Sequence, residues 1–130
     1  MSRLPSPQWY DLAKKLCGDK WAHFSPLNPS VDYVGPEGSY WSNLIPQAPF
    51  GVDFRPDAWI HDNLYRIGGT EDDRERADLV FSSMMLQSIQ DHKFPRICPN
   101  WLGRWLARHA AGGYYDAVRL GGGGCFSFMP

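Results

Sequence analysis

Three residue types that together perform acid–base catalysis occur in the middle of this chain. Tyr65 follows His61 at the spacing of one helical turn, and Asp78 lies farther along. An imidazole that faces a buried carboxylate is held in one tautomer, becomes more basic and can take a proton from water. We therefore predict that His61 is a general base and that Asp78 orients it. Tyr65 is expected to hold the Asp78 carboxylate by a hydrogen bond.

A carboxylate directly beside the predicted base has the chemistry of a metal ligand. Asp62 is turned by about 100° from His61 around a helix, so it points elsewhere. A lone carboxylate beside a loop rich in main-chain oxygens suits a hard cation such as Ca²⁺. The long segment 24–56 is rich in Pro, Gly, Ser and Asn, and residues 32–39 read Asp-Tyr-Val-Gly-Pro-Glu-Gly-Ser. Its glycines permit the sharp path that turns successive carbonyls inward, which makes it the candidate calcium loop.

A helical hairpin is the element that must bring the base and its partner together. Residues 56–67 begin with a proline and an acidic residue and contain no breaker before Gly68-Gly69, which predicts a helix. Thr70 to Asp73 has the form of a capping box, and it introduces a second helix that runs to about residue 90. Helices joined by a tight turn pack antiparallel, so residues equally far from the turn face each other. His61 and Asp78 meet this condition. The apolar stripe of the second helix consists of Ala77, Phe81, Met84, Met85 and Ile89.

Two further helices are expected on either side of this hairpin. Residues 8–17 form the first, and its Trp9, Leu12 and Leu16 either pack in the core or line an acyl channel. Residues 100 to about 119 form the other, with Gly112-Gly113 as a potential interruption. Residues 121–124 predict a hinge, followed by a short strand or a docked tail. We expect one mainly α domain over residues 1–130, built on two antiparallel helices with a long loop before them and a further C-terminal helix.

Other polar and aromatic residues receive structural interpretations. The acidic run Glu71-Asp72-Asp73 is expected to cap a helix rather than to bind a second metal ion. The following residues 74–76 are expected to form a solvated face, and the remaining histidines to lie on the surface. Aromatic residues in the last helix are expected in the core rather than on a lipid-contact surface, and either of its tyrosines could reach Asp78. These aromatic residues are Trp101, Trp105, Tyr114 and Tyr115; the residues of the solvated face are Arg74, Glu75 and Arg76; the histidines are His23, His92 and His109.

Composition and charge exclude several classes of protein. The formal net charge of -1 gives no field that would attract nucleic acid, so we expect no nucleic-acid partner. Three cysteines without paired spacing, Cys17, Cys98 and Cys125, argue against a disulfide framework and a structural zinc site. The N-terminus lacks the apolar stretch of a signal peptide, and no run is long enough to span a membrane. We therefore expect synthesis in the cytoplasm, with a membrane reached from a virion or after lysis.

Three stretches of the sequence together match a known set of motifs. They read Tyr33-Val-Gly-Pro-Glu-Gly38, Phe54-Arg-Pro-Asp-Ala-Trp-Ile-His-Asp-Asn-Leu-Tyr65 and Ala77-Asp-Leu-Val-Phe81. The set resembles the calcium loop, the His-Asp-x-x-Tyr helix and the Asp-x-x-Phe helix of the phospholipase A2 superfamily. The likeness is closest to members without disulfides, such as the parvoviral capsid domain and small phage-associated proteins. The phage-associated proteins also share a late stretch that reads here Tyr114-Tyr-Asp-Ala-Val-Arg-Leu-Gly-Gly122.

This resemblance implies a phospholipase A2-like fold that hydrolyses a phospholipid acyl ester, at a membrane surface, beside a bound Ca²⁺. The ion would be held by the backbone carbonyls of Tyr33, Gly35 and Glu37 and by the Asp62 carboxylate, and His61 would activate the attacking water. The chain departs from the secreted members in three respects. Glu37 replaces a loop glycine, the paired half-cystines are missing, and the segment from Tyr33 to His61 is longer.

Two alternatives of different classes remain open at this point. The first is a non-catalytic phage or virion component that keeps the scaffold and uses the ion as a structural clamp. The second is a metal-dependent phosphohydrolase built on the His61-Asp62 pair, which requires further His or Asp ligands on neighbouring helices. The sequence leaves the oligomeric state, the lipid head group and the acyl position undetermined.

Overall fold

The computed structural model describes residues 5–25, 52–92, 100–121 and 126–128, and these are mainly helical, as predicted. The elements are α1 (Pro7–Cys17), the 3-10 helix η1 (Gly18–His23), α3 (Arg55–Ile67), α4 (Glu71–Asp91) and α5 (Asn100–Gly121). The candidate calcium loop, Cys98 and Cys125 lie outside the described residues. Within the described residues, no helix is long and apolar enough to cross a bilayer.

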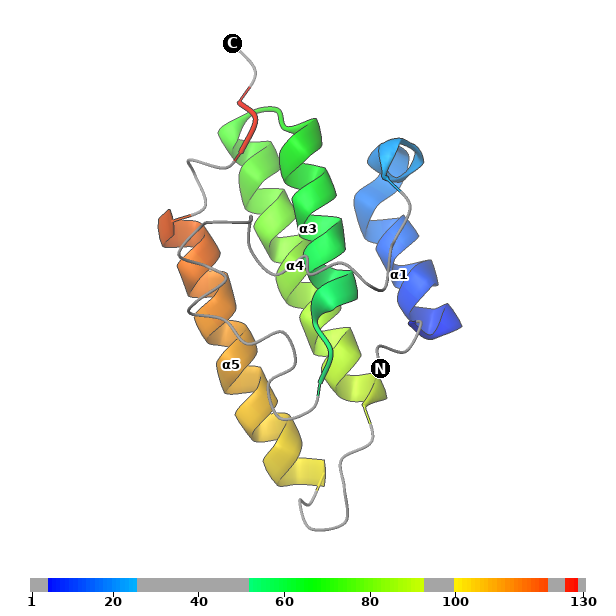
Figure 1. Cartoon of the computed structure of the whole chain (residues 1–130), viewed down its shortest axis with the longest axis vertical. Coiled ribbons are helices and arrows are strands. Elements are labelled where there is room, and N and C mark those ends of the chain that lie inside the picture. The colour runs from blue at the N-terminus through cyan, green and yellow to red at the C-terminus, as the bar shows by residue number, and fades with distance from the viewer. Residues whose placement is uncertain (1–4, 26–51, 93–99, 122–125, 129–130) are drawn as a thin grey trace.

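Helix α4 is the element around which the others assemble. It contacts α1, α3 and α5, and in Figure 1 the helices follow one another across the molecule in the order α5, α4, α3, α1. The predicted apolar stripe of α4 is buried throughout. Phe81, Met85 and Ile89 pack with residues of α5, whereas Ala77 and Met84 pack with residues of α1 and α3. The pair of helices α3 and α4 therefore has an apolar core on each side.

The connection between α3 and α4 forms as the sequence predicts. Gly68 and Gly69 have φ values of 74° and 136°, a region that favours glycine. The predicted capping box is confirmed, because Thr70 accepts from the Asp73 backbone N–H and the Asp73 side chain accepts from the Thr70 backbone N–H. The predicted docking of the tail is also confirmed. Ser127 donates its N–H to the Tyr65 carbonyl and accepts from the Gly69 N–H, at 3.1 and 3.0 Å.

Helix α5 differs from the prediction in two ways. It runs from Asn100 to Gly121 without interruption at Gly112-Gly113. It also packs on α4 through a face other than the one that carries its tryptophans, so Trp101 and Trp105 are 72% and 53% exposed rather than in the core. Tyr114 is buried, as predicted. Small side chains let two helices approach closely, which explains the choice of face. The buried residues of α5 are Gly103, Ala107, Ala111, Tyr114 and Val118.

Candidate functional site

The predicted opposition of His61 and Asp78 is confirmed by the structure. Nε2 of His61 lies 2.7 Å from Oδ1 of Asp78, and the Tyr65 hydroxyl donates to the same oxygen at 2.5 Å. The rings of His61 and Tyr65 are stacked one turn apart on α3, with their centroids 4.1 Å apart. The ring of Phe81 from α4 lies against the imidazole of His61, and the two ring centroids are 4.7 Å apart. All of these side chains are buried, and Asp78 is fully so. The hairpin thus holds His61 between the aromatic rings of Tyr65 and Phe81.

Arg119 of α5 completes the surroundings of Asp78 and was not foreseen. Its Nη1 donates to Oδ2 of Asp78 at 2.7 Å, and its Nη2 donates to Glu71 at 3.1 Å. The sequence left open that a tyrosine of the last helix reaches Asp78, and the group of this helix found at Asp78 is the Arg119 guanidinium. Each carboxylate oxygen of Asp78 therefore accepts at least one hydrogen bond. The only signal in the sequence was a basic residue in the last turn of a helix.

Arg74 was expected on the solvated face of α4, and that prediction was wrong. It is 7% exposed, and its Nη2 donates to the carbonyls of Val118 and Arg119 at 3.0 and 2.8 Å. The last carbonyls of a helix lack partners within the helix, so this arginine caps α5. Capping by Arg74 holds the end of α5 where Arg119 reaches Asp78. Glu75 and Arg76 are exposed, as predicted.

Burial favours a neutral imidazole, and the hydrogen bonds to Asp78 favour an ionised carboxylate. Burial raises the pKa of Asp78, but hydrogen bonds from His61, Tyr65 and Arg119 outweigh it and place that pKa below its ordinary value. Burial lowers the pKa of His61, and the neighbouring Asp78 offsets part of this effect. Burial and the Asp78 carboxylate raise the pKa of Tyr65, so its hydroxyl stays a donor. A neutral His61 is the form that can accept a proton.

The tautomer of His61 follows from its partner. An ionised Asp78 accepts a hydrogen bond, so Nε2 of His61 carries the proton and Nδ1 carries the lone pair. The His61 side chain is 10% exposed. Because Nε2 is engaged by Asp78, Nδ1 is the nitrogen that remains for a water molecule.

Only one of the four predicted metal ligands can be placed. Asp62 is half-buried on α3, beside His61, whereas Tyr33, Gly35 and Glu37 lie outside the described residues. Among residues that the structure describes, no three His, Cys, Asp or Glu side chains form a group that would hold a metal ion. Asp73 of the acidic run caps α4, as predicted. The donor of Asp62 is a hard oxygen, which suits Ca²⁺.

A second buried carboxylate lies near the other end of α3. Asp57, in the first turn of the helix, was interpreted as a partner of the helix dipole but is fully buried. It accepts hydrogen bonds from Nε1 of Trp9 at 2.7 Å and from the hydroxyl of Ser88 at 2.8 Å, and so connects α1, α3 and α4. Burial raises its pKa well above the ordinary value, and the nearby carboxylates of Asp53 and Asp91 raise it further. Burial therefore favours the neutral form of Asp57.

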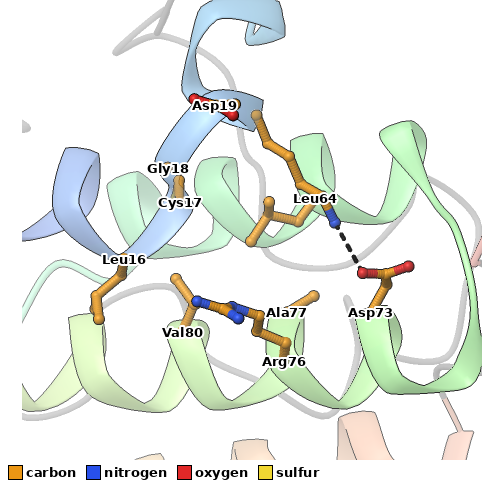
Figure 2. A pocket seen from close by; sticks show the side chains of 10 residues that line it. Leu16, Cys17, Gly18, Asp19, Leu64, Asp73, Arg76, Ala77 and Val80 are labelled. Atoms are coloured by element: carbon orange, nitrogen blue, oxygen red, sulfur yellow. Dashed lines mark hydrogen bonds and ion pairs between the residues drawn. The ribbon is translucent and has the colours of Figure 1, made fainter.

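A hollow of about 290 Å³ lies between the end of α1 and helix α4 (Figure 2). Its apolar lining residues include Leu16, Leu64 and Val80. Its polar lining includes an ion pair in which Nζ of Lys20 lies 3.3 Å from Oδ1 of Asp73. Leu16 was one of the candidate residues for an acyl channel. The lining residues do not include His61, Asp78 or the side chains that contact them, Tyr65, Phe81 and Arg119, so the hollow is separate from the site. Trp9, another of those candidates, is packed in the core.

Comparisons of this chain with protein-family models, with curated proteins and with solved structures find no match.

Proposed function

We propose that this protein hydrolyses the acyl ester of a phospholipid in a calcium-dependent reaction, with α3 and α4 as the antiparallel helix pair of a phospholipase A2-like fold. The observation that carries the proposal is the hydrogen bond between Nε2 of His61 and the ionised Asp78 carboxylate, made between two buried side chains. Tyr65, one turn after His61, holds the same carboxylate oxygen. The sequence motifs support the same reaction.

In this reaction Nδ1 of His61 takes a proton from a water molecule while the water oxygen attacks the ester carbonyl carbon. Asp78 stabilises the imidazolium that forms, and Tyr65 and Arg119 keep its carboxylate in place. The imidazolium then returns the proton to the alkoxide oxygen as the carbon–oxygen bond of the ester breaks. The products are a fatty acid and a lysophospholipid.

Asp62 and the backbone carbonyls of Tyr33, Gly35 and Glu37 would hold the calcium ion. The ion would supply positive charge that polarises the ester carbonyl and binds the phosphate. Replacement of Asp62 by Asn is expected to weaken calcium binding strongly, measured by calorimetric titration of the whole chain. Equal calcium affinity in this variant would contradict the assignment of Asp62 as a ligand.

The reaction is tested with fluorescent phospholipid vesicles and a calcium titration. We expect release of a fatty acid that EDTA abolishes and that His61→Gln removes while circular dichroism shows an unchanged helix content. His109→Gln, at an exposed position of α5, is the matched control and should keep the activity. Absence of release in every lipid presentation, with the chain folded and calcium present, would refute the proposal.

One observation favours a second candidate, a non-catalytic virion component that keeps the scaffold. Arg119 forms an ion pair with Asp78 and with Glu71, and such a bridged network also serves to lock α5 against α4. Calcium binding that raises thermal stability, without release of a fatty acid from any lipid, would support this candidate. A phosphohydrolase would instead act on phosphate esters with Mn²⁺.

A further inference from the structure

Helix α5 exposes a continuous face that no described element covers. Trp101, Trp105 and Leu120 are 72%, 53% and 89% exposed, although side chains of this kind are usually buried. Their spacing places them along one side of the helix. A shallow hollow lies at the middle of this side, lined by Trp105, Arg108, His109, Gly112, Gly113 and Asp116. We call these residues, with Trp101 and Leu120, the outer face of α5.

Two glycines at the centre of the outer face are not required by close packing against the residues that the structure describes. A Cβ atom added to Gly112 or Gly113 would meet nothing within 4 Å. Each glycine within a helix costs about 1 kcal/mol relative to alanine. Glycines that such packing does not require, between exposed tryptophans, are typical of a surface where another helix approaches closely.

The charges of the outer face complement each other when the face is paired with itself. Arg108 and Asp116 lie four residues before and four residues after Gly112, and both are exposed. In the described part of the chain, neither takes part in an ion pair. In an antiparallel pair of α5 helices centred on Gly112, Arg108 of each copy meets Asp116 of the other. The same register brings Leu120 of each copy within one residue of the position opposite Trp105 of the other copy, so these two apolar side chains can contact each other.

We propose that this protein forms a two-fold symmetric homodimer in which the outer faces of two α5 helices pack antiparallel across Gly112. A two-fold interface uses the same patch on both copies, so each favourable contact occurs twice. The proposal does not depend on the proposed function.

The test is analytical ultracentrifugation of the whole chain over a range of concentrations. We expect a monomer–dimer equilibrium, and we expect Arg108→Asp and Asp116→Arg, each alone, to weaken dimerisation about tenfold or more by placing like charges opposite each other. The double variant restores the opposite charges in reversed order and should recover most of the affinity. Arg76→Asp, the same change at an exposed position of α4, is the control and should dimerise normally.

A substitution at the centre of the interface separates dimerisation from folding. Gly112→Leu improves helix propensity, so the variant should keep its helix content and thermal stability as a monomer while losing the dimer. A wild-type chain that stays monomeric at millimolar concentration would overturn the proposal. Charge variants that dimerise like the wild type, or a double variant that does not recover, would overturn it too. A monomer that binds phospholipid vesicles through Trp105 would assign the outer face to a membrane instead.

Discussion

Each half of the α3–α4 pair contains a fully buried carboxylate, and the pKa values of the two carboxylates are shifted in opposite directions. Asp78 accepts hydrogen bonds from His61 and Tyr65 and forms an ion pair with Arg119, and its pKa is lowered. Among the residues that the structure describes, the donors to Asp57 are the neutral side chains of Trp9 and Ser88, and its pKa is raised. Both are 0% exposed. Burial acts to raise both pKa values, but the hydrogen bonds to Asp78 outweigh it, whereas the two hydrogen bonds to Asp57 do not.

The comparison shows what a buried carboxyl group requires in order to act as the partner of a histidine. A neutral acid can join helices by hydrogen bonds, as Asp57 joins α1, α3 and α4, but it cannot stabilise an imidazolium. An ionised one can, provided that a cation offsets the cost of its burial. Arg119 is this cation for Asp78, and it comes from an element far away in the sequence.

The largest expected effect is on turnover. Asp78→Asn should lower kcat by about a thousandfold, because the amide disturbs the tautomer of His61 and cannot stabilise its protonated form. Asp57→Asn makes the same chemical change at the other buried carboxylate and should leave kcat nearly unchanged. Both are measured as steady-state fatty acid release. Equal losses in the two variants would show that Asp78 acts through folding alone.

Removal of the cation should have the next largest effect, on stability. Arg119→Met leaves the Asp78 carboxylate without its ionic partner, and we expect the free energy of unfolding to fall by about 2 kcal/mol. The partial exposure of Arg119 keeps this below the cost of breaking a fully buried pair. Arg76→Met, at an exposed position of α4 outside the outer face of α5, should change the free energy of unfolding by less than about 0.5 kcal/mol in urea denaturation.

The pH dependence of stability should distinguish Asp57 from Asp78. A folded-state pKa above the ordinary value of 3.8 means that the folded chain binds the extra proton between the two values. The stabilisation by neutral Asp57 is therefore complete below about 3.8 and is lost as the pH rises through the raised pKa.

Asp57→Asn keeps the neutral form and should become more stable relative to the wild type as the pH rises. The difference should grow by about 1.4 kcal/mol for each pH unit between the two pKa values. Urea denaturation at several pH values measures it. A constant difference would mean that Asp57 does not ionise differently on folding.

The smallest expected effect concerns the second donor to Asp57. Ser88→Ala removes one hydrogen bond from a buried carboxyl group and should lower the free energy of unfolding by about 1 kcal/mol. Ser82→Ala, on the same helix, does not touch Asp57 and is the matched control. A loss of several kcal/mol in Ser88→Ala would indicate that the carboxyl group is charged at that pH.

Much of the hairpin could be predicted from the sequence, because its signals are local. Proline and glycine mark the ends of α3, the capping box marks the start of α4, and the equal distances of His61 and Asp78 from the turn predict that they meet. These features depend on helix geometry and on residues within a few turns of one another. Their chemical use remains a proposal.

The side of each helix that faces a neighbour could not be predicted in the same way. Helix α5 has two rows of residues at helical spacing, one of mostly small residues and one that contains Trp101 and Trp105. The size of the tryptophans favoured their row as the buried one, but the structure buries the other row. Arg74 was predicted to be solvated because runs of charged residues usually lie on the surface. Its carbonyl partners belong to the last turn of α5, which packs against α4 only in the tertiary structure. Periodicity identifies a stripe but not its partner.

By itself, the sequence determined where the helices begin and end and which residues of the hairpin oppose each other, because backbone hydrogen bonding and helical pitch act over short distances. Only the tertiary structure showed that the pKa values of the two buried carboxylates shift in opposite directions. The shift of Asp78 depends on the donors that other elements bring to it, first His61 and Tyr65 of α3 and then Arg119 of α5, because these hydrogen bonds outweigh the effect of burial.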